Sequence, residues 1–193
     1  MKPTVINKNY KLLIETGNQR IMEILFRFPD REFSLSELAK LSKVAKTNVG
    51  LMLENLQKLD FIEITKLSNL WRIKANQRNW GFIKSKIVYN LNFVYQSGLV
   101  EFLIGYFKNP KSIILFGSFG KGEDMSNSDI DIAIENDETK SYEIIGLREL
   151  SEFEKAIDRK IQIHIFNRKE IDIHVFNNIA NGIVLFGFLE VKK

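Results

Sequence analysis

Apolar residues divide the chain into three blocks with different periodicities. In the first block, residues 17–74, they recur every three to four positions over three successive segments, the spacing of helices with one buried face. Pro29 ends the first segment, and the capping-box pattern Ser34-Leu-Ser-Glu37 begins the second. Apolar and polar residues then alternate on both sides of a turn at Ser68-Asn69, as in a β-hairpin. The block therefore predicts three helices followed by a hairpin.

A long helical stripe of apolar residues makes up the second block, residues 76–108, and it is interrupted at Gly98. A stripe of this length has to be covered by other apolar surface. The C-terminal block could cover it, and so could a second copy of the chain in a homodimer. The pattern alone leaves both open.

The third block, from residue 110 onward, alternates short apolar runs with segments of helical spacing. Strand patterns occupy residues 112–117, 128–135, 160–166 and 182–191, and helical patterns occupy residues 142–157 and 169–180. A loop rich in glycine and charge separates the first two strand patterns. This order predicts a small mixed α/β sheet backed by helices.

The three blocks together predict an α+β chain with two domains. We place the first domain at residues 1–75, a helical linker at 76–109 and the mixed α/β domain at 110–193. The chain has no cysteine, its N-terminus lacks the apolar core of a signal peptide, and no apolar run approaches the ~20 residues that span a bilayer. We therefore expect a cytoplasmic protein with no membrane partner.

Three helices and a hairpin resemble a winged helix-turn-helix domain, a family in which the third helix reads DNA in the major groove. The resemblance implies double-stranded DNA as a partner. The residues it would place at the DNA are Lys43, Lys46, Thr47 and Asn48 near the third helix, and Lys66, Arg72 and the Ser68-Asn69 tip of the hairpin. A net charge of +4 permits this without requiring it. Because Glu54, Asp60 and Glu63 dilute the basic charge, a domain used for packing or dimerisation is the alternative.

Two acids interrupt an otherwise apolar strand in the third block. Side chains alternate along a strand, so Asp129 and Asp131 face one side while the isoleucines between and after them face the other. Two neighbouring carboxylates repel each other, and burying either without a partner is costly. A divalent cation removes that difficulty. The sequence thus predicts Mg²⁺ or Mn²⁺ held by Asp129 and Asp131.

A glycine-serine pair ends the preceding strand. Gly117 permits a sharp turn and a close approach of the backbone to a ligand, and backbone amides at such a turn favour an anion. Ser118 adds a hydroxyl donor and Lys121 a positive charge. We expect this loop to hold nucleotide phosphates. The loop acids Glu123 and Asp124 are expected to be solvated.

Gly-Ser, ten further residues and Asp-x-Asp resemble the signature of the DNA polymerase beta-like nucleotidyltransferase superfamily, and residues 115–134 are similar to its minimal, MNT-type branch. The resemblance covers about residues 110–190. It implies that Gly117 and Ser118 contact the phosphates and that Asp129 and Asp131 are catalytic metal ligands. Ser128, directly before the acids, also matches the motif and is expected to line the nucleotide site.

The resemblance implies a reaction and its partners. The domain would transfer a nucleoside monophosphate from an NTP, first of all ATP, to a hydroxyl on a protein, an RNA or a small molecule, with Mg²⁺ or Mn²⁺ as cofactor. Some MNT-type domains are antitoxins that adenylylate a HEPN toxin, so a toxin of that type is a candidate partner.

One departure from the family pattern keeps a second function open. Gln162 stands where the family usually has a third carboxylate, and a neutral amide cannot act as a base. His164, two residues on and on the same face, could serve as base or metal ligand or simply lie beside the site. The alternative is therefore a DNA-binding transcriptional regulator whose C-terminal domain binds a nucleotide without reacting. A purely structural role would need another explanation for the acid pair.

Overall fold

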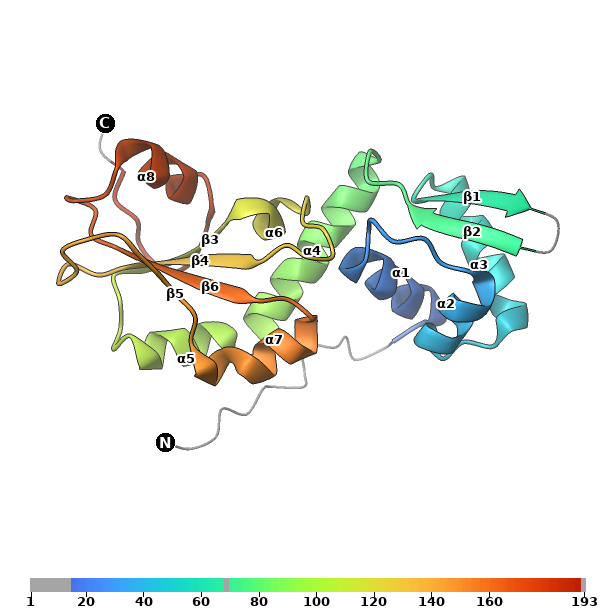
Figure 1. Cartoon of the computed structure of the whole chain (residues 1–193), viewed down its shortest axis with the longest axis horizontal. Coiled ribbons are helices and arrows are strands. Elements are labelled where there is room, and N and C mark those ends of the chain that lie inside the picture. The colour runs from blue at the N-terminus through green and yellow to red at the C-terminus, as the bar shows by residue number, and fades with distance from the viewer. Residues whose placement is uncertain (1–14, 68–69, 192–193) are drawn as a thin grey trace. The chain divides into compact units, whose positions relative to one another are not determined.

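The computed structural model describes residues 15–67 and 70–191. They fall into two compact units, and the division lies inside one helix, between Tyr89 and Asn90 (Figure 1). Helices and sheets occur in both units, so the chain is α+β. The domain boundaries predicted at residues 75 and 109 stay predictions.

The N-terminal unit contains three helices and a hairpin. They are α1 (Gly17–Arg27), α2 (Leu35–Ser42), α3 (Lys46–Lys58) and the antiparallel strands β1 (Ile62–Leu67) and β2 (Leu70–Ala75). The Ser34 hydroxyl accepts a hydrogen bond from the Glu37 backbone amide at the start of α2, as the capping pattern predicts. The elements that the sequence predicts here are confirmed, while the hairpin tip, Ser68-Asn69, lies outside the described residues.

Side chains from all three helices and the hairpin form one core in this unit. Ile21 and Leu25 of α1, Leu53 of α3 and Ile73 of β2 are fully buried in it. Phe33, in the segment before α2, joins β2 through an isolated bridge to Ile73. The apolar faces of helices and strands thus enclose a common interior.

Two helices lead into the sheet of the C-terminal unit. These are α4 (Trp80–Gln96) and α5 (Leu99–Tyr106), and the break between them falls at Gly98, as predicted. Gly98 has φ +85°, a left-handed conformation that glycine adopts without strain.

The sheet has five strands in the order β5-β6-β4-β3-β7. Their bounds are β3 (Ser112–Phe116), β4 (Ile130–Glu135), β5 (Glu143–Ile145), β6 (Ile161–Phe166) and β7 (Ile183–Gly187). β4 and β6 are parallel, and the other neighbouring pairs are antiparallel. The helices between strands are α6 (Gly117–Lys121), a 3₁₀ turn (Arg148–Leu150), α7 (Ser151–Ile157) and α8 (Ile173–Ala180). The mixed sheet predicted from the sequence is confirmed.

One face of this sheet positions the acids. Ile114, Ala133 and Phe166 project from β3, β4 and β6 into a cluster with Phe176 and Ile179 of α8. Because side chains alternate along each strand, Asp131 of β4 projects from this same face, nearer the start of the strand. The acid pair therefore lies beside this apolar cluster, on the face of the sheet that α8 covers.

Two local predictions were wrong. Residues 142–157 do not form one helix, because Glu143–Ile145 form β5, antiparallel to β6, and α7 begins only at Ser151. Pairing with an exposed strand edge outweighed a helical spacing over so few residues. The loop predicted after β3 instead begins with one short helix, α6.

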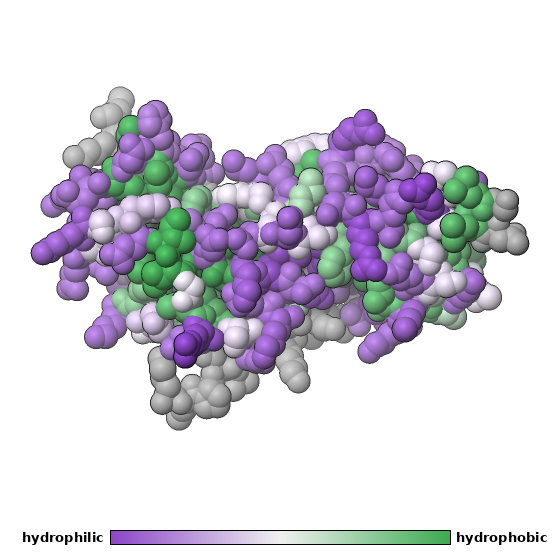
Figure 2. All heavy atoms as spheres, in the orientation of Figure 1, coloured by the Kyte–Doolittle hydropathy of each residue, from purple (hydrophilic) through white to green (hydrophobic). Residues whose placement is uncertain are grey.

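Figure 2 shows a largely hydrophilic face on which apolar groups occur as separate areas. Within the described ranges, every helix is too short or too polar to cross a bilayer.

Candidate functional site

The acid pair lies where three strands meet. Asp129 directly precedes β4, and Asp131 is its second residue, with Phe116 opposite it on β3 and Gln162 opposite it on β6. The Asp131 side chain is 26% exposed, so its carboxylate is open to a ligand on one side. Both acids thus lie at the start of β4, an interior strand of the sheet, as the alternation predicted from the sequence requires.

Gly117 packs against the Asp131 carboxylate. Its φ of +72° turns the chain out of β3, and a Cβ placed on it would collide with Oδ2 of Asp131 and lie 3.2 Å from its Cγ. Only glycine provides both the left-handed conformation and the space. The structure therefore places the start of the predicted phosphate loop directly beside one predicted metal ligand.

Gln162 donates a hydrogen bond from Nε2 to Oδ2 of Asp129. It projects from β6 on the face of the acids, at the position where the family resemblance calls for a third carboxylate. A carboxylate at this position would add a third negative charge. The Gln162 amide instead donates a hydrogen bond to the carboxylate of Asp129. The site therefore carries less negative charge than one with three carboxylates.

His164 lies deeper on the same face of β6. It is 6% exposed, and its Nε2 lies 3.1 Å from Oδ1 of Asp131. Its other ring nitrogen, Nδ1, is hydrogen-bonded to the Tyr142 hydroxyl, and the Phe116 ring meets the imidazole edge-on at 4.8 Å. Burial, together with the negative charge of Asp131, raises the pKa of Tyr142 above its ordinary value. Both ring nitrogens of His164 are thus engaged.

The two carboxylates are oxygen ligands of the kind that Mg²⁺ takes from proteins. Among the described residues, no cluster of three or more His, Asp or Glu side chains could hold a metal by itself. Mg²⁺ commonly takes only one or two carboxylates and completes its shell with water and substrate phosphates. Hydrogen bonds within the described ranges engage one oxygen each, Oδ2 of Asp129 and Oδ1 of Asp131.

The remaining predicted nucleotide contacts precede the acids in the chain. Ser118 is partly exposed in the first turn of α6, and Lys121 is exposed at its end. The Ser128 hydroxyl accepts a hydrogen bond of 2.9 Å from the Met125 backbone amide, which shapes the turn just before Asp129. Ser128 therefore has a structural contact, and its own hydroxyl proton can still be donated.

Two clefts adjoin the acid pair. One, of about 390 Å³, is lined by Ser128, Asp129 and residues of α7. The other, of about 610 Å³, is lined by Gln162 and by Arg148 from the 3₁₀ turn. Glu154 and Lys160 border both clefts. Hydrogen bonding to Glu154, with a further contribution from the charge of Asp129, raises the pKa of Lys160 and keeps it cationic.

Asp124 is a structural residue, and the expectation that it is solvated was wrong. It is 1% exposed, with Oδ2 3.5 Å from Nη2 of the equally buried Arg159 and Oδ1 accepting from Nδ2 of Asn90 at 3.0 Å. These contacts anchor the loop between α6 and β4 to α4 and to the start of β6. The neighbouring acid, Glu123, is exposed as expected.

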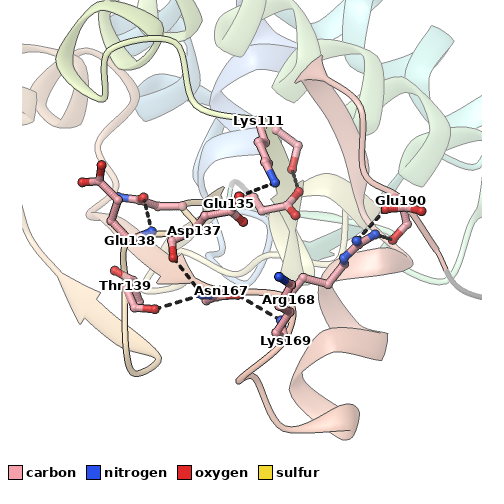
Figure 3. A network of polar contacts seen from close by, with 11 residues as sticks. Lys111, Glu135, Asp137, Glu138, Thr139, Asn167, Arg168, Lys169 and Glu190 are labelled. Atoms are coloured by element: carbon pink, nitrogen blue, oxygen red, sulfur yellow. Dashed lines mark hydrogen bonds and ion pairs between the residues drawn. The ribbon is translucent and has the colours of Figure 1, made fainter.

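A second polar network joins the loops at the opposite end of β4 (Figure 3). Lys111 pairs with Asp137, and the Asn167 side chain donates to the Asp137 and Thr139 carbonyl oxygens at 2.9 and 3.2 Å. The hydrogen bond to Lys111 lowers the pKa of Asp137. Since these groups form ion pairs and hydrogen bonds with one another at the ends of β4 and β6, the network has a structural role.

The residues predicted at DNA that the structure describes are exposed, but two of the basic ones are engaged. Lys43 follows α2, and Lys46, Thr47 and Asn48 form the exposed first turn of α3. Lys66 lies over the Trp71 ring with its Nζ 4.2 Å from the centroid. Arg72 makes two contacts to Glu32, 2.6 Å from Nη2 and 2.8 Å from Nε, which offset its charge.

The part of the chain that contains Gly117 and the acids is similar to a known protein family. Residues 99–188 match the model of the family described as polymerase beta, nucleotidyltransferase. The matched segment runs from α5 to β7 and contains Gly117, both acids and His164. It supports a nucleotidyltransferase domain in the C-terminal part of the chain. The match does not reach the N-terminal unit, whose likeness to a winged helix stays a prediction. Neither the curated proteins nor the solved structures gave a match to this chain.

Proposed function

We propose that the nucleotidyltransferase domain transfers a nucleoside monophosphate from an NTP, first of all ATP, to a hydroxyl group. The observation that carries this proposal is the contact between Gly117 and the Asp131 carboxylate, with Asp129 beside it on the same face. A close backbone turn for phosphates and a pair of oxygen ligands for Mg²⁺ are the two parts that this reaction requires.

Each residue of the site has a distinct task in this mechanism. Asp129 and Asp131 would hold the Mg²⁺, which supplies charge neutralisation at the triphosphate and stabilises the transition state. The backbone at Gly117 and the Ser118 hydroxyl bind phosphate oxygens, and Lys121 adds positive charge at the end of α6. The acceptor oxygen then bonds to the α-phosphorus as the bond to pyrophosphate breaks.

The proton of the acceptor hydroxyl has no carboxylate base on β6 and leaves to solvent water. The Gln162 amide cannot take it. His164 presents its nitrogens to Asp131 and Tyr142 and not to the cleft. Rate acceleration therefore depends on positioning and electrostatics, which still supply a large part of the barrier reduction. We expect a slow enzyme.

The acceptor enters through the clefts beside Gln162 and Asp129 in this proposal. The acceptor hydroxyl belongs to a protein, an RNA or a small molecule. The resemblance to MNT-type antitoxins makes a HEPN-type toxin the first protein acceptor to test. Arg148, exposed at the larger cleft, favours an acceptor that carries negative charge near its hydroxyl, while Glu154 offsets the charge of Lys160 there.

Label transfer tests the proposed activity. The protein is incubated with ATP labelled at the α-phosphate, Mg²⁺ and candidate acceptors. We expect covalent label on the acceptor, and we expect the double variant Asp129→Asn, Asp131→Asn to lose it. Asp137→Asn, which removes an exposed acid at the opposite end of β4, is the matched control and should retain labelling.

A regulator is the second candidate, favoured by Gln162 in the position of the third carboxylate. Such a protein would bind a nucleotide at Gly117 and the acids without transferring any part of it. Tight binding of ATP, measured by calorimetry, with no label on any acceptor would support this alternative over the enzyme.

The N-terminal unit supplies a DNA-binding surface in both candidates. We propose that it is a winged helix whose α3 enters the major groove, with Lys46, Thr47 and Asn48 at the bases or phosphates. Lys46→Ala should weaken binding to duplex DNA and flatten its salt dependence. Lys58→Ala, an exposed lysine at the far end of α3, is the matched control. Equal binding by both variants would contradict this proposal.

A further inference from the structure

We propose that His164 and Tyr142 form a hydrogen-bonded relay that positions the Asp131 carboxylate at the nucleotidyltransferase site. The relay runs from the Tyr142 hydroxyl to Nδ1 of His164, and from Nε2 of His164 to Oδ1 of Asp131 at 3.1 Å. Its link to metal and nucleotide rests on the proposed function, while the relay itself rests on these contacts.

The hydrogen-bond chemistry assigns the protons of the relay. An ionised carboxylate only accepts, so Nε2 of His164 carries a hydrogen and donates it to Asp131. In the neutral ring Nδ1 is then an acceptor, and the Tyr142 hydroxyl donates to it. The raised pKa of Tyr142 agrees with a phenol that keeps its proton. Tyr142 thereby selects the tautomer that Asp131 needs.

The surroundings hold the relay in one geometry. His164 is buried, and the Phe116 ring packs edge-on against it at an interplanar angle of 77°. Tyr142 lies just before β5, whose residue Ile144 pairs with His164 across the strand edge. The pairing of β5 with β6 thus brings the Tyr142 hydroxyl, just before β5, to His164 on β6.

The orientation of Asp131 follows from contacts on two sides. Oδ1 accepts from His164, and Oδ2 lies against Gly117, where a Cβ would collide with it. The carboxylate is therefore fixed with one oxygen towards the phosphate turn. Partners that orient metal ligands in this way typically contribute about 10–100-fold to metal affinity or activity. His164 and Tyr142 are positioning residues by this reasoning.

Nitrogen NMR of the histidine rings tests the relay without any ligand. The chain has only two histidines, so ¹⁵N-histidine labelling gives two ring systems, and His174→Ala assigns them. For His164 we expect a hydrogen on Nε2, with the Nδ1 signal shifted by Tyr142→Phe. A ring with no hydrogen on Nε2 would overturn the proposal, because Nε2 could then not donate to Asp131.

Metal binding tests its consequence. Titration of Mn²⁺ with a non-hydrolysable ATP analogue, followed by electron paramagnetic resonance, gives the affinity of each variant. We expect a loss of about 10-fold or more for His164→Ala. His164→Gln should recover part of it because its amide can also donate to Asp131, and Tyr142→Phe should cause an intermediate loss. His174→Ala, at an exposed site on α8, is the control.

The outcomes separate this inference from the proposed function. If wild type binds Mn²⁺ and nucleotide and His164→Ala binds them equally well, the positioning role is refuted while the proposed function stands. If the NMR signature is as expected but wild type binds neither probe, the proposed function falls together with the metal-positioning role. Should His164→Ala fail to fold, His164→Gln and Tyr142→Phe decide the same question.

Discussion

Replacing Gly117 by alanine should reveal how closely the phosphate turn and the acid pair are coupled. The substitution has two costs. A residue with a Cβ in the left-handed region is disfavoured by about 1–2 kcal/mol. The new Cβ also collides with the Asp131 carboxylate, with Cγ at 3.2 Å, so that side chain has to move.

The second cost depends on Asp131 alone and can be isolated. Moving Asp131 off its rotamer costs about 0.5–1.5 kcal/mol. Weakening its hydrogen bond to His164 adds about 1 kcal/mol. Gly117→Ala should therefore lower the free energy of unfolding by about 3.5 kcal/mol in the wild-type chain, and by only about 1.5 kcal/mol when Asp131 is already alanine, since only the backbone cost remains.

Urea unfolding of the four proteins in this double-mutant cycle measures the coupling. We expect a coupling free energy of about 2 kcal/mol, the sum of the two costs that depend on Asp131. Costs that add to within about 0.5 kcal/mol would refute the contact between Gly117 and Asp131. Mn²⁺ and ATP binding by Gly117→Ala should also fall, and unchanged binding would separate the turn from the site.

Three further predictions concern stability. Asp124→Ala should lower the free energy of unfolding by about 3–5 kcal/mol because the buried Arg159 guanidinium loses its carboxylate. Glu123→Ala, at the exposed neighbour, should leave the free energy of unfolding unchanged. Equal stability of the two variants would mean that Asp124 is solvated after all. Gln162→Asp should lower the melting temperature without metal, because three neighbouring carboxylates repel one another. Adding Mg²⁺ should then raise the melting temperature of this variant more than that of wild type. An equal rise in both proteins would count against a metal site at the start of β4. Because the pKa of Asp137 lies below its ordinary value of 3.8 in the folded chain, its stabilisation is present above that pH and lost below it. The difference in melting temperature between wild type and Asp137→Asn should accordingly be small at pH 7 and disappear in acid, and a difference that grew in acid would have the wrong sign.

Local spacing along the chain determined most of the fold and part of the site. The alternation that puts Asp129 and Asp131 on one face is a property of any strand, so it could be read before the sheet was known. The same holds for the break at Gly98 and for the capped start of α2 at Ser34, because both depend on residues within one turn of the chain.

Tertiary structure alone decided which distant residues complete the site. Tyr142 reaches His164 because β5 pairs with the edge of β6, although a helical spacing spans the same residues. Asp124 is buried because Arg159 and Asn90, far from it in sequence, converge on its loop. A hydrogen bond or ion pair between segments leaves no periodic trace in either one, so such contacts become visible only when the sheet brings the segments together.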